Sequence, residues 1–224
     1  EEDRITDALD QTSRGDQPLL AAGAEVAGRY RILRFVARGG GGEVYEAEDR
    51  ELGGRVALKT VDPHADDRKT ERFRREIQLA RRVTHPNACR IYDVGHHDSG
   101  ARDIPFLTME FLAGSNLAAY LAERGPLPLS EARGLARQMA EGLDAAHRAG
   151  VVHRDFKSSN VMLVPDADQV GGVRAVVTDF GLARSGRSGT AELRTKTGDG
   201  IVVGTPAYKA PEQVAGAQAG APAD

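Results

Sequence analysis

The sequence has only one cysteine and no tryptophan, and this scarcity excludes several classes of protein. The single cysteine, Cys89, cannot form a disulfide within the chain, and it cannot supply a cysteine-rich zinc site. The composition fits a reducing compartment, so we expect the protein in the cytoplasm. A membrane anchor outside these 224 residues stays an open alternative.

Long apolar runs and an excess of one charge are also missing. No apolar stretch approaches the ~18 residues that a membrane-spanning helix needs. The net charge of −3 leaves no basic footprint for nucleic acid. Hydrophobic residues make up 40% of the chain and charged residues 28%, as in a soluble globular protein. We therefore expect no nucleic-acid partner and no membrane segment here, whereas the oligomeric state stays open.

The hydrophobic pattern divides the chain into four parts. Residues 1–28 are polar and lack periodicity, which predicts a linker or a disordered arm. Strand-like runs separated by glycines and one helix follow, at 30–37, 43–49, 55–61, 70–83 (the helix), 88–95 and 106–111. Beyond residue 112 a long helix is expected at 130–149, with Gly150 as its left-handed stop. Short strands are expected at 161–164 and 174–178. Residues 215–224 are rich in Ala, Gly and Pro and are predicted to form a flexible tail.

A glycine cluster, Gly39 to Gly42, lies between the first two predicted strands. Glycines allow a tight hairpin and bring backbone N–H groups close to phosphate oxygens. A glycine cluster alone is more often an ordinary flexible hairpin, so this motif needs support from others.

Lys59 lies in the third strand-like run, in the sequence V-A-L-K at 56–59. Strand alternation places it on one face with Ala57 and Val61. Glu76 lies on the flank of the apolar stripe of the following helix, where a carboxylate turned toward a core needs a partner. Lys59 is one candidate. Two alternatives to the Lys59–Glu76 pair stay open: Glu76 is a charge on the helix surface, or its partner is a neighbouring arginine.

Three further motifs follow in order, and together with the first two they resemble the protein kinase family. They are H-R-D-F-K-S-S-N at 153–160, D-F-G at 179–181 and A-P-E at 210–212. The resemblance covers residues 29–213 and is closest to bacterial Ser/Thr kinases. It implies an α+β, two-lobe kinase-like fold with an antiparallel-sheet N-lobe and hinge at 29–112. A partial helical C-lobe would occupy 113–214, because the family continues well beyond A-P-E.

The family's catalytic roles carry over to matching positions of this chain. Asp155 corresponds to the base that orients and deprotonates the substrate hydroxyl. Lys157 matches the lysine with which Ser/Thr kinases contact the transferred phosphate. Lys59 would neutralise phosphate oxygens, with Glu76 fixing its position. The remaining implied site residues are Asn160 and Asp179 for Mg²⁺, and Ala37, Gly39, Gly42, Val44, Ala57, Lys59, Met109, Glu110 and Leu112 for the nucleotide. Ala37 stands where the family pattern has its first glycine.

These roles predict an ATP-dependent Ser/Thr protein kinase whose partners are ATP, Mg²⁺ and protein substrates. The alternative from another class is a pseudokinase or a truncated nucleotide-binding scaffold without transfer activity. A small-molecule phosphotransferase is disfavoured by the A-P-E motif and by Lys157.

Regulation is predicted in the polar segment between D-F-G and A-P-E. Thr195 and Thr197, and with less support Thr190, are candidate phosphorylation sites. Arg154 stands beside Asp155 and could pair with such a phosphate, which would order the segment. The alternative is that these threonines are only solvated loop residues.

Overall fold

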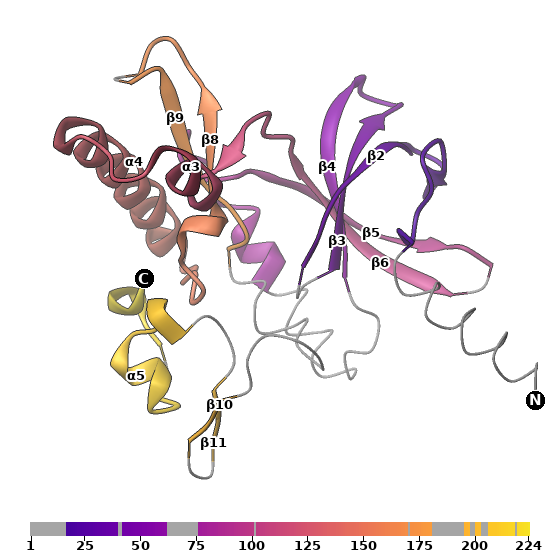
Figure 1. Cartoon of the computed structure of the whole chain (residues 1–224). Helices are drawn as coiled ribbons and strands as arrows, with labels where there is room; N and C mark the ends of the chain where they lie inside the picture. The colour runs from indigo at the N-terminus through magenta and orange to yellow at the C-terminus, as the bar shows by residue number, and fades with distance from the viewer. Residues whose placement is uncertain are drawn as a thin grey trace, which may run out of the picture.

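The computed structural model describes residues 17–39, 42–61, 76–100, 102–169, 171–180, 195–197, 200–202, 206–217 and 219–224. These residues form two lobes, a sheet-rich lobe that contains β2 to β6 and a helix-rich lobe that contains α3, α4, β8 and β9 (Figure 1). This is the two-lobe α+β architecture that the motifs predict.

The first lobe is a six-stranded antiparallel sheet in the order β1-β2-β3-β4-β6-β5. Its strands are β1 (Glu25–Val26), β2 (Tyr30–Gly39), β3 (Gly42–Asp49), β4 (Gly54–Thr60), β5 (Ile91–Asp98) and β6 (Asp103–Glu110). Residues 76–80 form the described part of the predicted helix, and its expected beginning lies outside the described residues. The five longer strands, β2 to β6, match the predicted strands to within a few residues at each end.

Alternation along β4 separates two apolar cores. Val56 and Leu58 are buried in a core that includes Tyr45 and lies within the first lobe. Ala57 belongs to a second core, which also contains Leu143 of the other lobe. Lys59 follows the parity of Ala57, as predicted, so its strand directs it toward the side on which the two lobes meet.

The second lobe is built on α3 (Leu117–Arg124), α4 (Leu129–Arg148) and a three-stranded sheet of β7 (Ser115–Asn116), β8 (Val161–Pro165) and β9 (Val173–Val177). Helix α4 packs closely enough on the loop before β5 that a Cβ on Gly142 would lie 2.3 Å from the Asn87 carbonyl oxygen. The helix ends one residue before Ala149, and Gly150 follows with φ +79°, the left-handed stop that the sequence predicts. Among the described residues no helix is long and apolar enough to cross a bilayer.

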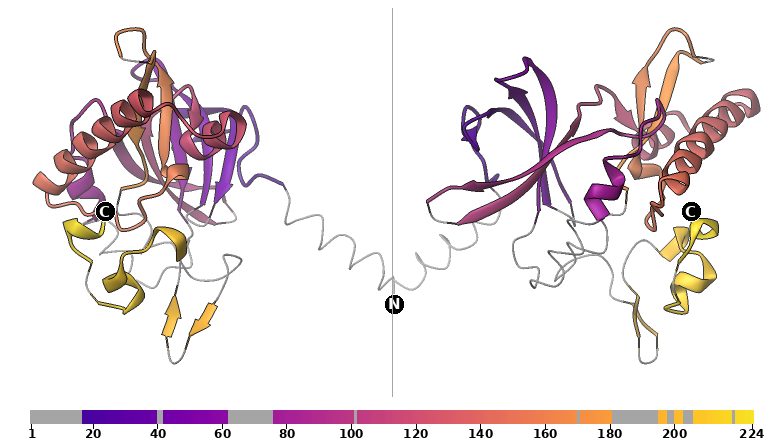
Figure 2. Two further views of the ribbon diagram at one scale, coloured as in Figure 1. Left: turned by 60° about the vertical axis from the view of Figure 1, so that its left-hand side comes forward. Right: turned by 180° about the vertical axis from the view of Figure 1, so that it is seen from behind.

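The last described elements are β10 (Thr195–Thr197), β11 (Gly200–Val202), the 3₁₀ turn η3 (Pro206–Tyr208), α5 (Pro211–Val214) and the 3₁₀ turn η4 (Ala221–Ala223). In both views of Figure 2 the segment that carries α5 lies beside the helical lobe. The side chain of Asp224 is fully buried there. The end of the chain was expected to be a flexible tail from its composition. Its described residues form backbone hydrogen bonds, and Asp224 binds the other segments.

Candidate active site

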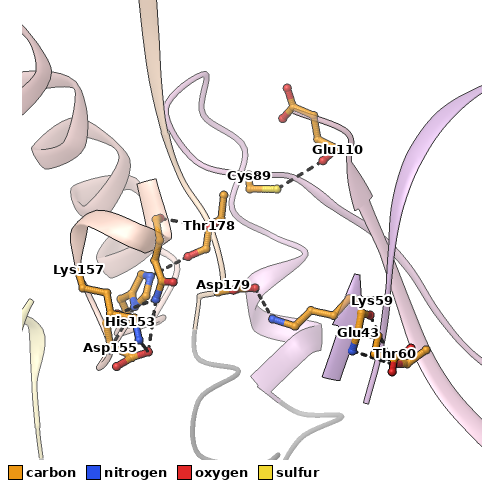
Figure 3. A network of polar contacts seen from close by, with 11 residues as sticks. Glu43, Lys59, Thr60, Cys89, Glu110, His153, Asp155, Lys157, Thr178 and Asp179 are labelled. Atoms are coloured by element: carbon orange, nitrogen blue, oxygen red, sulfur yellow. Dashed lines mark hydrogen bonds and ion pairs between the residues drawn. The ribbon is translucent and has the colours of Figure 1, made fainter. Parts of the chain in front are cut away.

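An ion pair between Lys59 and Asp179 joins the two lobes (Figure 3). Lys59 Nζ lies 2.6 Å from Oδ1 of Asp179, which follows β9 closely. Burial works to raise the pKa of the Asp179 carboxyl, but the adjacent ammonium outweighs burial, so this pKa lies below its ordinary value. Asp179 is therefore a carboxylate at neutral pH. Lys59, predicted to bind phosphate, and Asp179, predicted to bind Mg²⁺, are therefore in direct contact.

Glu76 does not form the expected pair with Lys59 among the described residues. Its Oε1 lies instead 3.2 Å from Nη1 of Arg154, the residue before Asp155. Both side chains are largely shielded from solvent, which strengthens the attraction between them. The arginine partner that the sequence left open is thus found, but it comes from the other lobe.

The H-R-D loop (residues 153–160) gathers three of the predicted site residues. Lys157 Nζ lies 3.2 Å from Oδ2 of Asp155, so a cation lies directly beside this carboxylate. The Asn160 amide nitrogen donates to the Asp155 carbonyl oxygen at 2.8 Å and lies 3.4 Å from Oδ2. A carbonyl can only accept, so the Asn160 NH₂ group must face it and the amide oxygen remains available as a ligand.

His153 is buried at the start of this loop and packs against Phe156 and Phe180. Its Nδ1 accepts the Asp155 N–H at 3.2 Å, which leaves Nε2–H to donate to the Thr178 carbonyl at 2.8 Å. Burial lowers the pKa of His153, so the neutral ring is favoured. His153 and Phe180 thus pack together in this loop, and His153 needs no charge to make these contacts.

The backbone on both sides of the site adopts a rare conformation. Arg154 has φ +65° and Asp179 has φ +63°, in the left-handed region that side chains other than glycine disfavour. Such residues cost about 1–3 kcal/mol each, so the surrounding structure must stabilise them.

Asp224 supplies part of that support and is a residue that the sequence analysis missed. Its two carboxylate oxygens accept the backbone N–H groups of His153 and Arg154, each at 2.6 Å. It also contacts Nε2 of His147 at 2.9 Å. The only available signal was that Asp224 is the sole charged residue after Glu212 in the sequence.

The glycine hairpin closes with Gly39 opposite Gly42, while Gly40 and Gly41 lie outside the described residues. Gly42 has φ +124°, and a Cβ there would lie 1.9 Å from the backbone oxygen of Thr60. Only glycine fits at this position. Ala37, which replaces the family's first glycine, pairs with Val44 in the β2–β3 ladder.

The predicted nucleotide-binding residues of β3, β4 and the hinge are brought together. Val44 pairs with Lys59, and Ala57 pairs with Met109. Leu112 packs against the core that contains Ala57 and Met109. Val44 packs against this core as well, so four of the predicted nucleotide-binding side chains share one apolar cluster.

Glu110 carries two contacts that sequence reasoning did not suggest. Its carbonyl oxygen lies 3.9 Å from the Cys89 thiol, whose pKa is raised by burial. Its carboxylate lies 3.2 Å from Arg174 of β9. The hinge residue is therefore tied to the second lobe through its side chain.

Comparison with known proteins gives one consistent result. A family model described as protein kinase domain matches residues 30–224. The serine/threonine-protein kinase pkn2 of Myxococcus xanthus is 42% identical over 193 residues, covering 85% of this chain and 22% of that protein. PknA of Mycobacterium tuberculosis is 36% identical over 205 residues, covering 90% of this chain and 45% of that protein. The chain thus spans less than half the length of these relatives.

A solved structure shares the fold. The M. tuberculosis PknI kinase domain superposes with a TM-score of 0.69 at 31% identity, covering 92% of this chain and 70% of that chain.

Proposed function

The chain belongs to the protein kinase family, and from this premise we propose that it transfers the γ-phosphate of ATP to Ser or Thr hydroxyls of proteins. The observation that carries the proposal is the convergence of Asp155, Lys157 and Asn160 on one loop, opposite the Lys59–Asp179 pair. We place this activity in the cytoplasm, where ATP is available and a buried free thiol such as Cys89 stays reduced.

The residues present fit ATP and Mg²⁺. Asn160 and Asp179 offer amide and carboxylate oxygens, the hard ligands that Mg²⁺ prefers. Gly42, at the glycine hairpin, has φ +124° and lies too close to the Thr60 backbone for any side chain, so this end of the hairpin exposes backbone groups, the kind that can bind phosphate oxygens. Bound Mg²⁺ would neutralise charge on the phosphates. Lys59, already ion-paired with Asp179, would hold the phosphates against the same site.

In the proposed reaction Asp155 orients the substrate hydroxyl and accepts its proton as the oxygen attacks the γ-phosphorus. The bond from the γ-phosphorus to the β,γ-bridging oxygen breaks, and ADP leaves. Lys157 lies beside Asp155 and would stabilise the charge on the transferred phosphoryl group. The Asn160 amide donates a hydrogen bond to the Asp155 carbonyl, and this bond would hold the proposed base at a fixed distance from the proposed metal ligands.

The test is Asp155→Asn in the full-length protein, with radiolabelled ATP, Mg²⁺ and a generic protein substrate. The amide keeps the shape of the carboxylate but cannot accept the proton. Transfer to Ser or Thr should fall by ~10²–10⁴ while ATP affinity changes little. A wild-type protein that binds ATP and labels no Ser or Thr would instead indicate a scaffold. An equal loss of nucleotide affinity would make Asp155 structural.

A further inference from the structure

Arg154, the strained residue before the proposed base, is hydrogen-bonded through both its backbone N–H and its backbone carbonyl. Arg154 has φ +65°, and it directly precedes Asp155. Its N–H donates to Asp224 at 2.6 Å. Its carbonyl oxygen accepts from Nε2 of Gln213 at 2.8 Å. The conformation that sets the direction of the chain at Asp155 therefore depends on two residues from the last part of the sequence.

Gln213 also holds the element from which it comes. Its Oε1 accepts the Ala210 N–H at 3.1 Å, at the start of α5. One planar amide thus uses its acceptor on the A-P-E segment (residues 206–214) and its donor on the H-R-D loop. No other uncharged side chain of this length offers both groups in one rigid unit. A glutamate could accept but not donate, and a methionine could do neither.

A second contact joins the same two segments independently. The hydroxyl of Tyr208 lies 2.9 Å from the hydroxyl of Ser158, three residues after Asp155. The A-P-E segment is therefore fixed to the H-R-D loop on both sides of the base, at Arg154 and at Ser158.

We propose that Gln213 is a positioning residue that fixes where Asp155 lies relative to the A-P-E segment. This inference rests on the proposed kinase function and adds a residue that the family motifs did not indicate. In the described part of the chain the Gln213 side chain forms hydrogen bonds only to Ala210 and Arg154, neither of which lies in β3 or β4. Its effect should therefore fall on the transfer step and leave ATP binding unchanged. Misplacement of a reacting group by about 1 Å can cost ~10²-fold in rate.

The experiment compares Gln213→Met and Gln213→Glu with wild type in the full-length protein. Gln169→Glu is the matched control, since Gln169 is exposed in the turn between β8 and β9. Both Gln213 variants should lose about 10- to 100-fold in kcat. Their KM for ATP should stay within about twofold of wild type, and Gln169→Glu should behave as wild type. Undiminished kcat in both variants would overturn the proposal, as would a loss of ATP affinity equal to the loss of kcat.

Hydrogen–deuterium exchange supplies a readout that does not depend on transfer. The backbone amides of the H-R-D loop should exchange faster in Gln213→Met than in wild type, while those of β4 stay unchanged. Equal exchange in the two proteins would overturn the positioning role. If the wild type transfers no phosphate, the kinase proposal fails, and exchange still decides whether Gln213 holds this loop.

Discussion

Lys59 Nζ lies 2.6 Å from Oδ1 of Asp179, so a strand of the first lobe is bound to a residue 120 positions later in the chain. Lys59 is largely buried, and water screens the pair less than it would an exposed one. The pair lies where the proposed phosphate and metal ligands meet. Changing either residue should therefore affect nucleotide chemistry more than the packing of either lobe.

Lys59→Met should abolish phosphotransfer and leave the fold intact. Methionine keeps the apolar stem but loses the charge that holds phosphate oxygens, and loss of such an electrostatic contact costs about 10²–10³ in kcat. Steady-state transfer and circular dichroism would measure the two effects. Arg137→Met is the control, because this residue is exposed on α4 and pairs only with Glu141 among the described residues. Transfer by Lys59→Met at the wild-type rate would show that the lysine assignment is wrong.

Strand periodicity and motif order predicted most of what positions this site. The face assigned to Lys59 is correct because side chains alternate in β4 and two separate cores lie on its two sides. The stop of α4 at Gly150 was also visible, because few other residues adopt φ +79° readily.

The contacts between distant segments were not visible in the sequence. The Glu76–Arg154 pair depends on where a helix of one lobe meets a loop of the other, and no local pattern encodes that placement. Asp224 and Gln213 act through hydrogen bonds to backbone groups, which leave no hydrophobic period and need no complementary side chain. A segment rich in Ala, Gly and Pro can therefore look unstructured and still carry ordered contacts.

Gly42→Ala should weaken both the glycine hairpin and ATP binding. A Cβ would lie 1.9 Å from the backbone oxygen of Thr60, and φ +124° disfavours any side chain. We expect a loss of about 1–3 kcal/mol in the free energy of unfolding. The KM for ATP should rise as well. Gly54→Ala is the control, since a Cβ at Gly54 meets nothing within 4 Å and its φ is not in the left-handed region. Equal stability and KM in the two variants would contradict this prediction.

The buried, neutral His153 should make stability depend on pH. Burial lowers its pKa, although the Thr178 carbonyl and the carboxylates of Asp224, Asp179 and Asp155 favour the charged ring. The unfolded chain takes up a proton below pH ~6.5 while the folded ring stays neutral. Stability is therefore full above that pH and falls as the pH drops toward the folded pKa, by at most about 1.4 kcal/mol per pH unit.

Urea unfolding between pH 5 and pH 7.5 would measure this slope. His153→Gln should be less stable at pH 7.5 but should show a smaller slope. A His153→Gln slope equal to that of wild type would assign the pH dependence to other groups.

Phosphorylation between D-F-G and A-P-E should act through Arg154. Thr195 and Thr197 lie in β10, which pairs with β11 in a hairpin, while Thr190 lies outside the described residues. Nε of Arg154 is buried without a hydrogen-bond partner among the described residues, and its Nη1 binds Glu76. The guanidinium therefore has donor capacity left.

A phosphate on Thr195 or Thr197 adds about −1.5 to −2 charge and should compete with Glu76 for Arg154. Glu76, released from Arg154, could then pair with Lys59 as the family pattern implies, and transfer activity should rise. Mass spectrometry of the full-length protein after incubation with ATP should find phosphate on one of these threonines. A double alanine variant should be less active, while single variants show whether one site suffices. Phosphate found only outside residues 186–204, or a double alanine variant with undiminished activity, would reject this mechanism.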